Sequence, residues 1–111
     1  MIEKIILDYL NEELDVPAYM EKPKNPPASY VLIEKTGSSR RNKINSSMFI
    51  VQSIAESLLK AAQLNEAVKE AMDGLITLPS VSRSDLNSDY NFTDPETGVY
   101  RYQATYDLVH D

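Results

Sequence analysis

The chain of 111 residues contains no cysteine, no tryptophan, only three glycines and a single histidine. Without cysteine it has no disulfide, no thiolate metal ligand and no cysteine nucleophile. Three glycines do not provide a phosphate-binding loop: the segment TGSSRR at residues 36–41 lacks the second glycine and the Lys-Ser/Thr pair of a P-loop. These absences remove most of the common catalytic and cofactor motifs.

The sequence also lacks a long hydrophobic run and an excess of positive charge. No apolar run approaches the ~20 residues of a membrane-spanning helix. The N-terminal MIEKIILDYL carries acidic residues and no small-residue cleavage site, unlike a signal peptide. The formal net charge of −6 argues against general nucleic-acid affinity, because neutralising phosphates needs clustered lysine and arginine. We therefore expect one soluble domain, residues 1–111, made in the cytoplasm and without a membrane partner.

The first half of the chain predicts a helix followed by three strands. An apolar stripe of an amphipathic helix is formed by Ile2, Ile5, Ile6, Tyr9 and Leu10. The expected strands are VPAYM at residues 16–20, SYVLIEK at residues 29–35 and SMFIVQ at residues 47–52. The first is expected at a sheet edge because it contains proline, and the third in the centre because both its faces are apolar. Residues 21–28 predict a proline-rich connector, and TGSSRRNKIN at residues 36–45 a long polar loop.

The second half predicts a long helix and then a β-hairpin. Ser53 and Glu56 match a capping box, and the helix is expected to end between Gly74 and Pro79. Its apolar stripe consists of Ile54, Leu58, Ala61, Val68, Met72 and Leu75, with Asn65 inside it. The hairpin places Leu86, Tyr90 and Phe92 on one face, and a TDPETG turn leads into its second strand, residues 99–110. Together these elements predict an α+β fold: a mostly antiparallel sheet of about four strands with two helices packed on one face.

Groups suited to catalysis or metal binding are sparse. His110 lies one residue from the C-terminus with Asp107 and Asp111 nearby, and a solvated tail is favoured over a metal site there. Three carboxylate pairs are also present, at Glu12/Glu13, Asp85/Asp89 and Asp94/Glu96. Nothing in the sequence brings them into one cleft, so solvated faces and turns are favoured over acid–base chemistry. We expect no catalytic residue, no cofactor and no bound metal.

One basic cluster stands out from this acidic sequence. Lys35, Arg40, Arg41 and Lys43 supply four of its eleven lysines and arginines within nine residues. Two interpretations stay open: an ordinary charged loop, or a mobile arm that meets an acidic partner, a neighbouring subunit or DNA passing close by.

The last strand has two faces of different character. Its apolar and aromatic positions are Tyr100, Tyr102, Ala104, Tyr106 and Leu108, and its polar positions are Arg101, Gln103, Thr105 and Asp107. A base-stacking platform is disfavoured, because the strand lacks the glycine of the RNA-recognition motif and carries an aspartate among its tyrosines. We expect the tyrosine face to cover the long helix and the polar face to meet solvent or a neighbouring subunit.

In the order and local sequence of these segments, the chain resembles the small tail-completion proteins of siphophages and prophages, the lambda-type tail terminators and their Gram-positive relatives. The resemblance covers most of the chain. It lies in MIEKIILDYLNEEL, VPAYMEKPKNPPASYVLIEKTG, MFIVQSIAESLLKAAQLNEAVKEAMDGL and LNSDYNFTDPETGVYRYQATYDLVH.

The resemblance implies a non-enzymatic α+β subunit of the virion that assembles into a homo-oligomeric ring, commonly a hexamer. Such a ring caps the tail tube and forms the surface that joins the head, so its partners are the tube and head-completion proteins, and DNA only passes through it. Family analogy places residues 36–45 near the ring lumen or the tube contact. Two alternatives are another phage neck protein of the head–tail connector, and a small nucleic-acid-binding regulatory module that uses Arg40 and Arg41.

Overall fold

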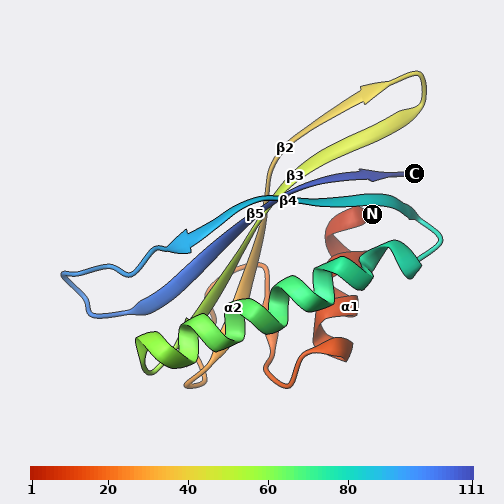
Figure 1. The fold of residues 1–111 in the computed structure, drawn as a ribbon. Helices are drawn as coiled ribbons and strands as arrows, with labels where there is room; N and C mark the ends of the chain where they lie inside the picture. The colour runs from red at the N-terminus through yellow and green to blue at the C-terminus, as the bar shows by residue number, and fades with distance from the viewer.

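A twisted sheet of five strands, with both helices on one of its faces, forms the body of the protein (Figure 1). The computed structural model describes residues 1–111. The helices are α1 (Ile2–Glu13) and α2 (Leu58–Asp73), which a 3₁₀ turn, η1 (Gly74–Thr77), extends. The strands are β1 (Ala18–Tyr19), β2 (Tyr30–Arg41), β3 (Ile44–Ala55), β4 (Val81–Asn91) and β5 (Tyr100–His110). Neither helix is both long and apolar enough to cross a membrane.

The strands follow the order β1-β2-β3-β5-β4 across the sheet. β1 pairs parallel with β2, and the other three pairings are antiparallel. The predicted α+β class is therefore confirmed, but four strands was one too few and the sheet is mixed, because the two residues of β1 add a short parallel edge strand. β3 is central, as its two apolar faces predicted.

The hydrophobic core lies between the sheet and the two helices. Three residues of the predicted stripe of α1, Ile2, Ile6 and Leu10, are buried, whereas Ile5 and Tyr9 are only half-buried. The other large members of the core are Val31, Ile33, Phe49, Val51, Val68, Met72, Leu75, Tyr106 and Leu108. Alternate residues of a strand point to opposite faces, and the core members from β2, β3 and β5 follow this alternation within each strand, whereas β4 contributes only Val81. Burying such a side chain completely contributes about 1.5–3 kcal/mol.

The two faces of β5 are separated as its alternation predicted. Ala104, Tyr106 and Leu108 are buried on the face that the helices cover, which we call the helix face. Tyr100 is 39 % exposed at the start of the strand. The opposite face carries no helix, and we call it the open face.

Tyr106 is buried to 1 % exposure, yet its hydroxyl has no hydrogen-bond partner. Burial raises the pKa of this hydroxyl, and a buried polar group without a partner costs about 1–3 kcal/mol. Tyr106→Phe is therefore expected to raise the free energy of unfolding in urea by about 1 kcal/mol. Tyr102→Phe, two residues away and half-buried, is the matched control and should change it by less than about 0.5 kcal/mol. A loss of stability in Tyr106→Phe would contradict the prediction.

The start of α2 differs from the predicted capping box. Ser53 belongs to β3 and is completely buried, and the helix begins at Leu58. Ser57 is the N-cap, where its side-chain oxygen accepts a hydrogen bond from the backbone N–H of Lys60 at 3.1 Å. The prediction failed because β3 stays paired with β5 as far as Ala55. Strand pairing on both sides outweighs a local capping signal.

β4 contains a bulge that separates two residues predicted on one face. The register shifts between Leu86 and Ser88. Leu86 therefore pairs with Tyr106, which faces the helices, whereas Tyr90 pairs with Gln103 on the open face. At the following turn Gly98 has a φ of 68°, which confirms the left-handed position predicted there.

Candidate functional site

The segment predicted as a long polar loop is a β-hairpin, so that prediction was wrong. β2 runs on to Arg41 and β3 begins at Ile44. The two residues between them, Asn42 and Lys43, have φ angles of 53° and 67°, and a turn of this kind matches the twist of the adjoining strands. We call residues 38–46 the arm. Its residues are exposed or half-buried, and it projects from one end of the sheet (Figure 1).

The four cations of the predicted basic cluster do not stay together. Lys35 Nζ lies 3.1 Å from Glu3 Oε2 and joins β2 to the first turn of α1. A backbone hydrogen bond at this helix start and the Lys35 ammonium hold the pKa of Glu3 below its ordinary value. Arg40, Arg41 and Lys43 are exposed on the arm and form no ion pair within the chain. The candidate contact set is therefore these three residues.

The arm concentrates positive charge on a chain that is acidic overall. No aspartate or glutamate occurs between Lys35 and Ala55, while the whole chain has a formal net charge of −6. Arg40 pairs with Asn45 and Arg41 with Ile44, so the two arginines point to opposite sides of the hairpin. A cationic arm on an acidic body suits contact with an acidic partner, which includes another copy of the same chain.

The four residues predicted as a subunit contact all lie on the open face. These are Arg101, Gln103, Thr105 and Asp107. Gln103 is only 6 % exposed: its Oε1 accepts a hydrogen bond from Gln52 Nε2 at 2.8 Å, and its Nε2 donates to the Tyr90 hydroxyl at 2.6 Å. This chain of hydrogen bonds crosses β3, β5 and β4 and holds the middle of the open face in one conformation.

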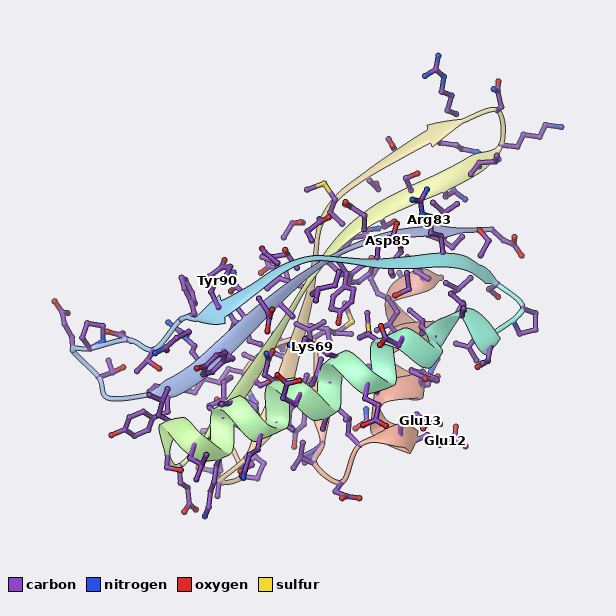
Figure 2. The ribbon with its side chains drawn as sticks, in the orientation of Figure 1. Glu12, Glu13, Lys69, Arg83, Asp85 and Tyr90 are labelled. Carbon is purple, nitrogen blue, oxygen red and sulfur yellow. The ribbon has the colours of Figure 1, made fainter.

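The ends of the open face are charged. Arg101 lies over the ring of Phe92, 4.9 Å from its centroid, and donates from Nε to the Phe92 carbonyl oxygen at 2.8 Å. Towards the arm, Asp107 sits directly opposite Asp85, which forms an ion pair with Arg83. Figure 2 shows Arg83 and Asp85 at the end of the sheet from which the arm projects, and Tyr90 towards the other end. A groove of about 570 Å³ lies here, lined mainly by serines of the arm strands, Met48 and the two aspartates.

His110 and Asp107, weighed together as metal ligands, lie on opposite faces of the sheet. His110 Nε2 is 2.7 Å from Ser47 Oγ, and its Nδ1 is 2.9 Å from the backbone oxygen of Asp111. A serine beside a histidine is the geometry of an activated nucleophile. Ser47 is only 3 % exposed, however, so a substrate has no access to its oxygen. The contact joins the end of β5 to β3.

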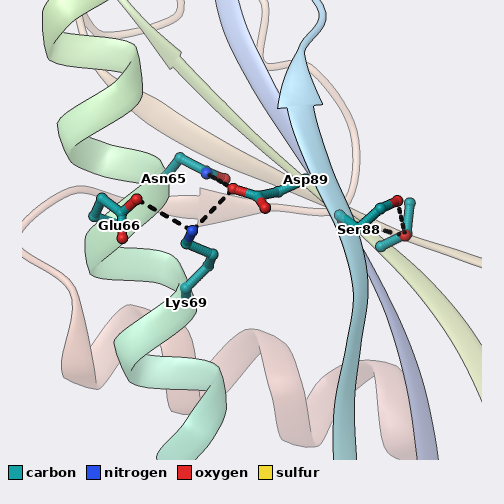
Figure 3. A network of polar contacts seen from close by, with 6 residues as sticks. Asn65, Glu66, Lys69, Ser88 and Asp89 are labelled. Atoms are coloured by element: carbon teal, nitrogen blue, oxygen red, sulfur yellow. Dashed lines mark hydrogen bonds and ion pairs between the residues drawn. The ribbon is translucent and has the colours of Figure 1, made fainter.

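A polar network joins α2 to β4. Asn65 is the only member of this network that the sequence pattern singles out. Asn65, the polar residue inside the apolar stripe of α2, is 1 % exposed and donates from Nδ2 to Asp89 Oδ2 at 2.7 Å. Lys69 Nζ lies 3.0 Å from the same oxygen and 3.1 Å from Glu66 Oε1 (Figure 3). Lys69 is the main reason that the pKa of Asp89 lies below its ordinary value, and Asn65 adds to the effect. The network fixes the side of α2 that faces β4.

The structure does not gather the remaining carboxylate pairs into one cleft. Asp85 faces the open side and Asp89 the helix side, because the bulge at Leu86 lies between them. Glu12 and Glu13 lie at the end of α1 (Figure 2). No group of three or more potential metal-ligating side chains occurs. The candidate functional surfaces are thus the arm and the open face.

No model of a known protein family matches this chain, and no curated protein matches its sequence.

Proposed function

We propose that this protein is a non-enzymatic structural subunit that assembles with copies of itself into a ring, and that the ring terminates a phage tail tube and provides the surface for joining the head. The observation that carries the proposal is the arm, a strand pair that extends past the part of the sheet the helices cover. The base of the arm is held in the sheet, because Asn45 and Ser46 pair with β5, and only residues 41–44 at its tip continue beyond that pairing. A contact outside the chain accounts for an arm that contributes no residue to the core.

The position of the arm also supports a ring over a symmetric pair. The arm projects from one end of the elongated molecule, whose extents are 45 × 25 × 25 Å, while the helices cover a different surface (Figure 1). When the arm of one subunit meets a different surface of the next subunit without the reverse contact between the same two copies, the contact is heterologous, and it produces a ring when the rotation closes. The resemblance of the chain to tail terminators supplies the role that such a ring would have.

The test is direct observation of the assembly. The purified full chain, alone and mixed with tail tubes, is expected to form rings of uniform size in negative-stain images, with a matching mass by light scattering. Rings located at tube ends support termination, whereas rings that bind only the head-side connector support another neck protein. A strict monomer that does not bind tubes would contradict the proposal.

A nucleic-acid-binding module is the second candidate, favoured by the three exposed cations of the arm. If the protein has this function, it binds DNA or RNA at low salt and the binding weakens as the salt concentration rises. The Arg40→Ala/Arg41→Ala variant is then expected not to bind. Binding that is absent at low salt removes this candidate.

A further inference from the structure

We infer that the arm of one copy docks into an acidic groove on α2 of the next copy. This inference rests on the proposed function and names the surfaces by which the ring would close. The argument begins at the tip of the arm, where Ile44 is 55 % exposed. Arg41 lies directly opposite Ile44, and Lys43 precedes it in the turn. The tip thus presents one apolar side chain beside several cationic ones.

The groove on α2 has the complementary arrangement. Its volume is about 520 Å³, and it is lined by Glu66, Ala67, Lys69, Glu70, Asp73 and Leu86. Leu86 is 41 % exposed although it is a leucine of the sheet, and Ala67 is exposed on the helix. The groove thus combines two apolar side chains with three acidic ones, and its one cation, Lys69, is already held by Glu66 and Asp89.

The acidic side chains of the groove repel one another within the isolated chain. Glu70 and Asp73 are three residues apart on α2, lie next to each other on the helix surface and form no ion pair within the chain, whereas Glu66 is already paired with Lys69. Like charges at this spacing destabilise a helix. The last turn of α2 contains no basic residue, although the carbonyl end of a helix favours cations. Cations supplied by a neighbouring arm would remove both unfavourable terms.

A second acidic groove lies next to the first and extends the same surface. It is formed where α1 meets α2, and its lining includes Glu13, Asp15 and Glu70. Glu70 therefore belongs to both grooves. An arm with cations on both its sides has acidic partners available along this whole surface.

The contact has to be made between copies. The arm projects away from α2 in the same chain (Figure 1), and its base is held at α1 by the Lys35–Glu3 ion pair. The arm and the groove are different surfaces, so each copy keeps one free arm and one free groove until the ring closes. The following experiment distinguishes this contact from the alternative, in which the arm binds DNA or the tail tube.

The absence of cysteine makes the test specific, because introduced thiols are the only ones present. The full-length double variant Ile44→Cys/Ala67→Cys is oxidised with and without tail tubes and examined on a non-reducing gel. We expect a ladder of covalent oligomers that ends at the copy number of the ring. Ile44→Cys/Glu96→Cys, with the second thiol on an exposed turn, is the matched control and should give no ladder. A ladder no stronger than the control overturns the inference, and so does a dimer of Ile44→Cys alone, which would mean that arm tips meet each other.

Charge reversal provides a second, independent measurement. Arg41→Glu/Lys43→Glu and Glu70→Lys/Asp73→Lys are each expected to reduce assembly at least about tenfold, because like charges then face each other and the Glu66–Lys69 pair is kept. Combining the four changes in one chain should restore assembly, whereas Lys22→Glu/Lys24→Glu in the exposed connector should leave it unchanged. Failure of the combined variant to recover, while both parents fold and fail to assemble, overturns the inference. Rings that form independently of the arm and the groove overturn it too but leave the proposed function standing, whereas a monomer that ignores tubes contradicts both.

Discussion

Phe49→Ala is expected to lower the free energy of unfolding by about 3–5 kcal/mol. Met48→Ala, one residue earlier in the same strand, is expected to change it by less than about 0.5 kcal/mol. Phe49 is 1 % exposed and lies opposite Tyr106 on the helix face, so its removal leaves a cavity between the sheet and the helices. Met48 is 52 % exposed on the open face, and its truncation leaves no cavity.

The contrast is measured by urea unfolding monitored by circular dichroism. The two variants are compared provided that their unfolding free energies depend on urea concentration with the same slope. Phe49→Leu keeps part of the buried volume and should lose less stability than Phe49→Ala. Equal losses for Met48→Ala and Phe49→Ala would mean that both faces of β3 are covered in solution, for example by a neighbouring subunit on the open face. Dilution would then restore the contrast, because stability gained from association depends on protein concentration.

The central position of β3 was predictable from sequence, but the face that the helices cover was not. The segment at residues 47–52 has apolar side chains at successive positions, which places it inside a sheet. Met48 and Phe49 are equally apolar in that pattern, and only the packing of α1 and α2 separates them. The stripe of α1 and the end of α2 near Gly74 were predictable for a related reason, since each depends on residues close together in the chain.

The arm could not be predicted from hydrophobic pattern, because it has almost none. Serine, asparagine, lysine and arginine are poor indicators of a strand, and no buried face imposes alternation on them. The pairing is instead carried by the backbone, since β3 remains paired with β5 from Asn45 onward and gives β2 a template to continue along. Asn42 was the available signal, because asparagine tolerates the positive φ of a two-residue turn.

The composition of the candidate site was predictable, whereas its partners within the chain were not. Three of the four cations in the basic cluster do lie together on the arm, but Lys35 is drawn to Glu3 by a contact between distant parts of the chain. Asn65 was likewise identifiable as a polar residue in an apolar stripe. Its partner Asp89 was not, because a bulge in β4 decides which face that aspartate occupies. Contacts of this kind depend on register, which the sequence of one strand does not determine.

Asp89→Ala is expected to lower the free energy of unfolding by about 2 kcal/mol, because it leaves the amide of Asn65 buried without its acceptor. Asp85→Ala is the matched control from the same strand. It removes only the solvent-exposed ion pair with Arg83 and should cost less than about 1 kcal/mol. In the Asn65→Ala background the loss from Asp89→Ala should shrink, since the buried donor is then absent. An undiminished loss in that background would contradict the role given to Asn65.

The difference between the wild type and Asp89→Ala should also depend on pH. Lys69 first, and then Asn65, lower the pKa of Asp89 in the folded state, so the stabilisation is complete above the ordinary carboxyl pKa of 3.8 and is lost as the pH falls through the lower folded value. Hydrogen bonds to Asp89 and Glu66 raise the pKa of Lys69 in the folded state. The stabilisation that Lys69 contributes is therefore complete below pH 10.5 and is lost as the pH rises through the higher folded-state pKa. The difference should therefore be constant across the neutral range and decrease at both extremes. A difference that stays undiminished as the pH falls through the folded-state pKa of Asp89 would mean that the aspartate stabilises α2 without its charge. Lys69 of the same network also pairs with Glu66, which lines the acidic groove, so under the proposed docking Asp89→Ala should weaken assembly as well as the fold.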